Sequence, residues 1–150
     1  DADVADFAGW TTLYHLRLSH TGITNAALPA LRQLPQLQSL SLAHTAINDA
    51  ALDELPALTS LDLAGTAITA TGIATLARQN RITAISLDET SFDDTAAQQI
   101  TAWTALRSLS IQNTRITDAG LLLLPNLVRL QLRGAPVPEI DAGLTPPGRE

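Results

Sequence analysis

The chain has 150 residues, a net charge of −6, and 45% apolar but only 3% aromatic residues. This length is sufficient for one domain with a continuous core, and the apolar content excludes a disordered acidic tail. The negative charge argues against a nucleic-acid partner, because phosphate binding requires a basic face. No apolar run reaches the roughly 18 residues of a membrane-spanning helix. Because the chain has no Cys, it has neither disulfides nor thiolate metal sites.

Residues 1–12 precede the first complete repeat unit of the chain. Val4, Phe7 and Trp10 are spaced as on one face of a helix, and Trp10 stands three residues before Leu13. The later units end with the same spacing. We therefore expect residues 1–12 to be the back half of a unit, either an N-terminal cap or the cut edge of a longer array. The chain also begins without Met, from which we expect a processed or excised product.

Five tandem units follow, with the bounds 13–36, 37–57, 58–81, 82–105 and 106–126. The last of them, LRSLSIQNTRITDAGLLLLPN, shows the shared pattern most clearly: L-x-x-L-x-L-x-x-T-x-I, then apolar residues three apart. Apolar residues at the fourth and sixth positions predict a short strand with alternate side chains directed inward. The later spacing of three predicts a helical or 3₁₀ return segment with one apolar face.

A unit of this length cannot bury its apolar side alone, so the units must stack on one another. The sequence therefore predicts an α/β repeat solenoid. A parallel sheet would line its concave side, and short helical or 3₁₀ returns would form its convex side. Asn25, Asp49 and Asp118 have residue types that cap helices, and we expect them to cap the return segments, with Asp94 in the same role in the fourth unit.

A sixth unit is incomplete. Its apolar pattern continues at Leu127, Leu130, Leu132 and Val137. Ala135 replaces the Thr of the other units, and Pro136 and Pro138, which cannot donate a backbone hydrogen bond, follow at once. We therefore expect the array to span residues 13–137, between the segment 1–12 and a Pro-rich, extended or disordered tail at 138–150.

These units resemble the leucine-rich repeat family over residues 13–137, in the Thr-containing form LxxLxLxxTxITD that is common in bacterial proteins. The resemblance implies a horseshoe or arc. The family usually has Asn at the ninth position, where its side chain bonds to backbone groups of adjacent turns. Here that position is Thr21, Thr45, Thr66, Thr90 and Thr114. Because a hydroxyl can both donate and accept, we expect a buried hydroxyl ladder with the same role.

The strand positions that face away from the predicted core are where such folds usually bind. They form our candidate partner-binding surface, which comprises His15, Arg17, His20, Ser39, Ser41, His44, Ser60, Asp62, Ser86, Asp88, Glu89, Ser108, Ser110, Gln112, Arg129 and Gln131. The side chains at the centre of this surface are small and mostly carry hydroxyl groups. Its acidic residues lie in the third and fourth units, and its positively charged residues lie at both ends. The pattern predicts a shallow groove for a peptide, loop or subunit of a protein partner. The alternative is a partner that binds at an edge or on the convex side.

Two histidines and three acids on this surface are the only candidates for chemistry. His20 and His44 occupy the eighth position of adjacent units and should lie about 5 Å apart. They could hold a metal or sense pH, but the spacing provides no third ligand, so we predict no metal and no cofactor. On an open face Asp62, Asp88 and Glu89 would not be desolvated enough for acid–base catalysis. With no phosphate-binding loop or nucleophile elbow either, we predict that the chain is not an enzyme.

The function that the sequence favours is a non-enzymatic protein–protein interaction module. We expect an exported bacterial protein, periplasmic or secreted, or an accessory or scaffold subunit of a larger assembly. One alternative is the repeat region of a host-directed effector, because unit 58–81 resembles repeats of plant-pathogen effectors of the GALA type, which pair repeats with an F-box. No F-box is recognisable in the short N-terminal segment. Another alternative is the specificity domain of a larger enzyme. The sequence predicts no oligomeric state.

Overall fold

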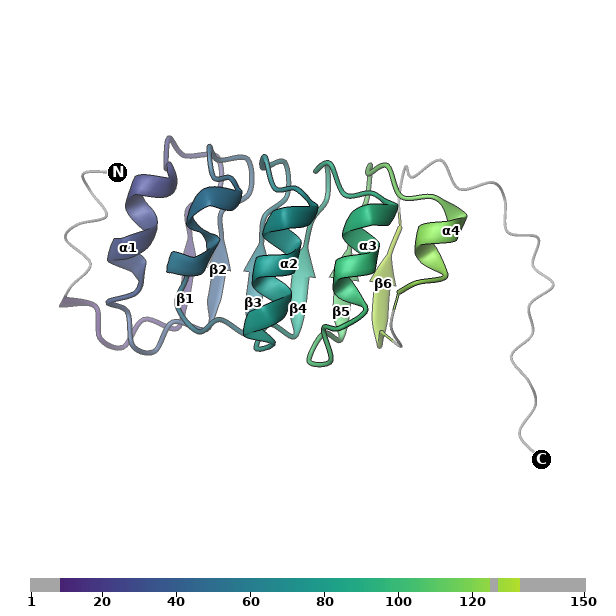
Figure 1. Cartoon of the computed structure of the whole chain (residues 1–150). Helices are drawn as coiled ribbons and strands as arrows, with labels where there is room; N and C mark the ends of the chain where they lie inside the picture. Colours follow the sequence, from purple (N-terminus) through teal and green to yellow (C-terminus); the bar gives the residue numbers. More distant parts are fainter. Residues whose placement is uncertain (1–8, 125–126, 133–150) are drawn as a thin grey trace, which may run out of the picture.

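The computed structural model describes residues 9–124 and 127–132, and it contains one sheet of six short parallel strands (Figure 1). The strands are β1 (His15–Arg17), β2 (Ser39–Ser41), β3 (Ser60–Asp62), β4 (Ala84–Ser86), β5 (Ser108–Ser110) and β6 (Arg129–Gln131). They lie in chain order and pair in one constant register, with the fourth position of each unit opposite the fourth position of the next. The predicted register of the repeats is therefore confirmed.

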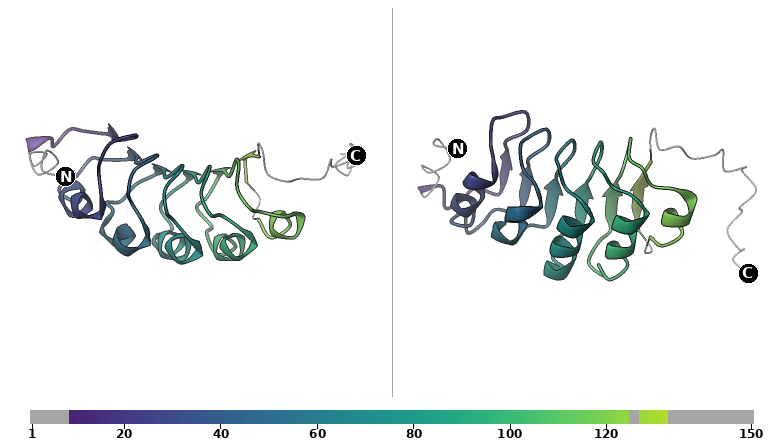
Figure 2. Two further views of the ribbon diagram at one scale, coloured as in Figure 1. Left: turned by 90° about the horizontal axis from the view of Figure 1, so that it is seen from above. Right: turned by 45° about the horizontal axis from the view of Figure 1, so that its top comes forward.

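The return segments lie on the side of the solenoid that is opposite the sheet. They are η2 (Asn25–Ala27), α1 (Leu28–Leu31), η3 (Asp49–Glu54), α2 (Ala70–Gln79), α3 (Asp94–Ile100) and α4 (Asp118–Leu121), where η denotes a 3₁₀ helix. Seen from above, the sheet forms the inner side of a shallow arc and the helices form its outer side (Figure 2, left). This arrangement confirms the predicted α/β solenoid with a concave sheet and convex helical returns.

The core lies between the sheet and the helices and is almost entirely aliphatic. In β2 to β5 the central residue of each strand is buried and its two neighbours are half-buried, which is the period of two expected for a strand with one inward face. Phe92 and Trp103 are the buried aromatic side chains of the described core, and Trp103 is the more completely enclosed. Its Nε1 donates to the carbonyl oxygen of Ile82 at 3.1 Å, so its burial leaves no unpaired donor.

The ninth-position Thr residues are buried in the second to fifth units, but they do not link adjacent units. Each hydroxyl donates to the carbonyl oxygen of the residue three before it, at 2.5–2.8 Å: Thr45 to Leu42, Thr66 to Leu63, Thr90 to Leu87 and Thr114 to Ile111. Thr21 makes the same bond to Leu18 but is exposed. The predicted ladder between units is therefore wrong. The chain turns sharply after each strand, which brings the hydroxyl over the carbonyl of its own unit.

The predicted capping residues lie one position too far along the chain. The true N-cap residues, which have extended backbone, are Thr24, Asn48, Thr69, Asp93 and Thr117. The predicted Asn25, Asp49, Asp94 and Asp118 are instead the first residues of their helices. An N-cap side chain must precede the first helical residue to reach the free N–H groups of the first turn, and in four of the five N-caps it accepts such a bond.

In three of these helices the first residue binds the next unit by hydrogen bonds, a contact that we call a clasp. Asp49 accepts from the backbone N–H of Thr69 at 2.9 Å and also from its hydroxyl. Asp94 does the same with Thr117, at 2.8 Å to the N–H and 2.6 Å to the hydroxyl. Asn25 accepts from the backbone N–H of Asn48 at 3.1 Å and donates from its side-chain amide to Asn48 Oδ1 at 2.7 Å. Each clasp fixes the start of one helix against the start of the next.

Parts of the predicted domain division lie outside the described residues. These are Val4 and Phe7 of the N-terminal segment, Ala135 to Pro138 at the expected end of the array, and the tail 138–150. Trp10, the last aromatic residue of the N-terminal segment, is 50% exposed. None of the described helices is long and apolar enough to cross a membrane.

Candidate partner-binding face

The candidate surface is the concave face of the sheet. The third and fifth residues of each unit lie on either side of the inward central residue of a strand, so their side chains point to the concave side. Most of the predicted residues are in strands. The others follow in the turns: His20, His44, Asp88, Glu89 and Gln112. The structure therefore brings all of the predicted residues to one face, while whether that face binds a partner stays a prediction.

A first polar network on this face is centred on Asp62 and joins the first three units. The hydroxyl oxygens of Ser19 and Ser41 are 2.6 Å apart, and Ser41 donates to Asp62 Oδ2 at 2.7 Å. The backbone N–H of Ala64 donates to Asp62 Oδ1 at 3.1 Å. These bonds hold the Asp62 carboxylate in one position.

A second polar network is centred on Asp88 and joins the last three units. Ser110 donates from its hydroxyl to Asp88 Oδ1 at 2.7 Å, and the backbone N–H of Gln112 donates to the same oxygen at 2.6 Å. The side-chain amide of Gln112 donates in turn to Gln131 Oε1 at 3.3 Å. Glu89 differs from the two central acids, because its side chain is exposed and makes no hydrogen bond or ion pair with the described residues.

His20 and His44 stack face to face, with ring centroids 4.5 Å apart and an interplanar angle of 13°. This confirms the predicted proximity. Nowhere in residues 9–124 and 127–132 do three His, Asp or Glu side chains come together as a metal site would require. A Cβ added to Gly65 would lie 2.3 Å from His44 Nδ1, so the His44 ring rests directly on the Gly65 backbone. The stack therefore depends on a residue without a side chain in the next unit.

The eighth position of each of the five complete units has left-handed backbone, with φ between 54° and 63°. The residues are His20, His44, Gly65, Glu89 and Asn113. Of these residues, His20, His44 and Glu89 line a hollow on the concave face. Sequence reasoning missed the left-handed backbone, although Gly and Asn at two of these positions are residues that tolerate it.

Within residues 9–124 and 127–132, two adjoining hollows lie on the concave face. The larger, of about 500 Å³, is lined by Arg17, Ser19, His20, Ser41, Ala43, His44, Asp62, Ala64, Ser86, Asp88 and Glu89. The smaller, of about 280 Å³, is lined by Ser60, Leu61, Asp62, Ala84, Ile85, Ser86, Ser108, Ser110, Arg129 and Gln131. Asp62 and Ser86 line both. Ser19, Ala43 and Ala64 were not among the predicted residues, although their shared seventh position in the repeat alignment could have identified them.

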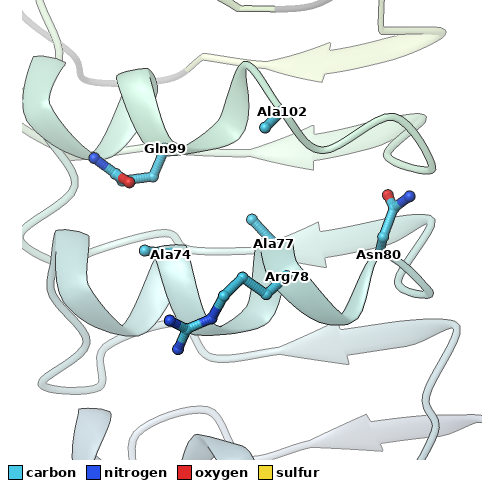
Figure 3. A pocket seen from close by; sticks show the side chains of 6 residues that line it. All are labelled: Ala74, Ala77, Arg78, Asn80, Gln99 and Ala102. Atoms are coloured by element: carbon cyan, nitrogen blue, oxygen red, sulfur yellow. The ribbon is translucent and has the colours of Figure 1, made fainter.

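A third hollow, also of about 500 Å³, lies on the convex side between α2 and α3 (Figure 3). It is lined by Ala74, Ala77, Arg78, Asn80, Gln99 and Ala102. Figure 3 shows Gln99 extending from α3 toward α2. Asn80 is already engaged, because its amide donates to the Thr104 hydroxyl at 2.9 Å and accepts from the Ala105 N–H at 2.9 Å. The convex side therefore offers a hollow of similar size but with less charge than the concave one.

Stacked strand-and-helix units around one aliphatic core, with an open polar face, define a repeat solenoid. Models of the leucine-rich repeat match residues 7–68 and 104–124 of the chain. The chain belongs to the leucine-rich repeat family. No curated protein sequence matches it.

Several solved structures share this fold. Internalin C2 from Listeria monocytogenes has a TM-score of 0.65 and 24% identity, over 86% of this chain and 55% of that one. A second internalin from the same bacterium, internalin F, has a TM-score of 0.51 and 19% identity, over 85% and 50%. A chain of the octameric complex of latrophilin 3, Unc5D and the leucine-rich repeat part of FLRT2 has a TM-score of 0.57 and 18% identity, over 83% and 47%. The chain thus spans about half the length of these structures, and at such identities the likeness defines the fold alone.

Proposed function

We propose that the chain is a non-enzymatic protein-interaction module that binds a peptide, loop or subunit of another protein on its concave face. The observation that carries this proposal is the pair of adjoining hollows on that face, which share Asp62 and Ser86. Small side chains at the centre let a partner backbone approach closely. The hydrogen-bonded carboxylates of Asp62 and Asp88 are already held in place, so little conformational entropy would be lost on binding.

The charge of the face supports a partner with some basic character. The larger hollow contains three acids, Asp62, Asp88 and Glu89, and one Arg, Arg17. Few large aromatic anchors are present, so we expect the affinity to be spread over many contacts rather than concentrated in a hot spot.

Crosslinking of the chain in its native source tests this proposal. The chain has no Lys, so the reagent must couple carboxylates. With the partner bound, we expect crosslinks at Glu89, the exposed acid of the concave face. Crosslinks confined to Asp53 and Glu54, which lie in η3 on the convex side, would contradict the proposal. Recovery of the chain without any protein partner would contradict it as well.

We further propose that the chain is an exported bacterial protein, periplasmic or secreted, or a scaffold subunit of a larger assembly. A bacterial origin is supported by the likeness to two Listeria proteins and by the Thr-containing form of the repeat. Fractionation of the native source tests the location. Recovery of the chain in the cytoplasmic fraction alone would exclude export and leave only the scaffold role.

A further inference from the structure

The two stacked histidines of the concave face are carried by backbones that are fixed relative to each other. His20 donates its backbone N–H to the carbonyl oxygen of Ala43 at 2.8 Å, and His44 donates to that of Ala64 at 2.7 Å. Both have left-handed backbone, with φ of 58° and 54°, which sets the direction in which each side chain leaves the main chain. The His44 ring also rests on the Gly65 backbone. The two rings can therefore separate only by rotation of the side chains.

A stack of two imidazole rings loses its stability when both rings become charged. Histidine is the residue whose side chain gains a positive charge between about pH 8 and pH 5. With ring centroids 4.5 Å apart, repulsion disfavours the doubly charged stack by about fivefold, even in water. An exposed aromatic pair is favoured by only about twofold to threefold, so the repulsion is the larger effect. Because both side chains are exposed, a ring that rotates away is solvated directly.

Other charged side chains line the same hollow as the two rings. Among the described residues these are Arg17 on β1, Asp62 on β3, and Asp88 and Glu89 in the turn after β4. The carboxylates favour charged rings, whereas the guanidinium and the second imidazole oppose them. His15, the remaining histidine of the chain, does not line this hollow. Three acids and one Arg give the hollow a net charge of −2 while both rings are neutral, and two charged rings bring that charge to zero.

We propose that the stack of His20 and His44 is a pH-sensitive element of the concave face. The rings stay stacked while at most one of them is protonated and separate when both are. The change removes the negative charge of the larger hollow and so weakens the binding of a basic partner as the pH falls. This last step rests on the proposed function, because it requires binding on the concave face. The separation of the rings is a property of the chain alone, so the two can be tested independently.

Proton NMR of the full chain without a partner tests the separation of the rings, at about pH 8 and about pH 5. The ring current of each stacked imidazole shifts the Cε1 proton of the other. We expect the His20 shift to differ between the wild type and His44→Asn at the higher pH, and this difference to vanish at the lower pH. Asn is the matched replacement, because Asn113 has the same left-handed backbone at the same position of the fifth unit. The control His15→Asn should leave the His20 shift unchanged.

Calorimetric titration with a hexa-arginine peptide, used as a basic probe, tests the effect on binding at the same two pH values. We expect the affinity of the wild type to fall by about fivefold, because two new positive charges about 8 Å from a bound cation each weaken binding by about twofold in water. The double variant His20→Asn/His44→Asn should lose most of this fall, since neither position can gain a charge. The control His15→Asn should behave as the wild type. Far-UV circular dichroism checks that each variant is folded.

Two results would overturn the proposal. The first is a difference in the His20 shift between the wild type and His44→Asn that is the same at both pH values. The second is hexa-arginine binding that is absent at the higher pH or that falls equally in the wild type and the double variant. Failure of the proposed function is distinguishable from both, because crosslinks confined to the convex side would contradict that function and leave the ring shifts unaffected.

Discussion

The strand side of the solenoid is regular from unit to unit, whereas the return side varies in helix type and length. The strands all have three residues and one register, whereas the returns range from the 3₁₀ helix η3 to the ten-residue helix α2. The 21-residue unit 37–57 contains η3, and the 24-residue unit 58–81 contains α2. The 24-residue unit 13–36 nevertheless contains only η2 and α1, and the 21-residue unit 106–126 contains the α-helix α4, so unit length alone does not set the return, while the strands keep one register throughout. On the concave face the backbone is therefore the same in every unit and only the side chains differ. Differences in the number of residues per unit are accommodated on the convex face.

The largest effect should come from the buried residues that directly follow the inner strands. Leu63→Ala empties a fully buried position, and we expect a loss of about 2–5 kcal/mol of unfolding free energy. Leu87→Ala should cost a similar amount, because the two residues occupy the same position in adjacent units. Leu130→Ala, at the partly exposed edge, should cost less. Thermal or urea unfolding measures all three. A melting curve of Leu63→Ala that coincides with that of the wild type would refute the register.

On the return side, Gly72 and Gly120 both lack room for a side chain, and Gly72 serves as the test. A Cβ there would lie 2.2 Å from Asp49 Oδ1 and 2.8 Å from Leu52 Cδ1. We expect Gly72→Ala to destabilise the chain by about 1–2 kcal/mol, since overpacking of about 1–3 kcal/mol outweighs the helix propensity gained. Gly22→Ala is the matched control, because its Cβ would meet nothing within 4 Å. Equal unfolding midpoints for the two variants would show that the Asp49 clasp can move aside.

A smaller, pH-dependent effect should come from the clasp between the fourth and fifth units. The hydroxyl of Thr117, then its N–H, hold the pKa of Asp94 below its ordinary value of 3.8, and the Gly120 N–H adds to this. A lowered folded-state pKa contributes stability that is complete above the ordinary value and is lost as pH falls through the folded-state pKa. We expect Asp94→Asn to be less stable than the wild type at neutral pH and to approach it below pH 3.8.

Asp53→Asn is the control for this titration, because Asp53 is exposed on η3 and its side chain makes no hydrogen bond within the described part of the chain. Unfolding midpoints as a function of pH give the comparison. A stability difference between Asp94→Asn and the wild type that is equal at neutral and acidic pH would contradict the assigned bonds.

The repeat pattern was sufficient to predict the strands, their order and the side of the sheet on which each residue lies, because these follow from periodicity alone. It was not sufficient for the helix starts. Thr117 and Asp118 both have residue types that cap helices, and the choice between neighbours depends on backbone geometry. The role of Asp94 depends on where the next unit places Thr117, which is a tertiary contact. The polar networks of the concave face escaped prediction for the same reason, although the repeat alignment places Ser41 beside Asp62.

The most direct test of concave-face binding compares Ser86→Arg with Gln99→Arg by measuring the partner's Kd. Both variants introduce the same large cation into a half-buried position. Ser86 lines both concave hollows, and Gln99 lines the convex one. Binding on the concave face predicts that Ser86→Arg weakens the affinity by about tenfold or more, which is about 1.4 kcal/mol, while Gln99→Arg leaves it unchanged. Loss of affinity in Gln99→Arg with full affinity in Ser86→Arg would contradict the account and assign binding to the convex side.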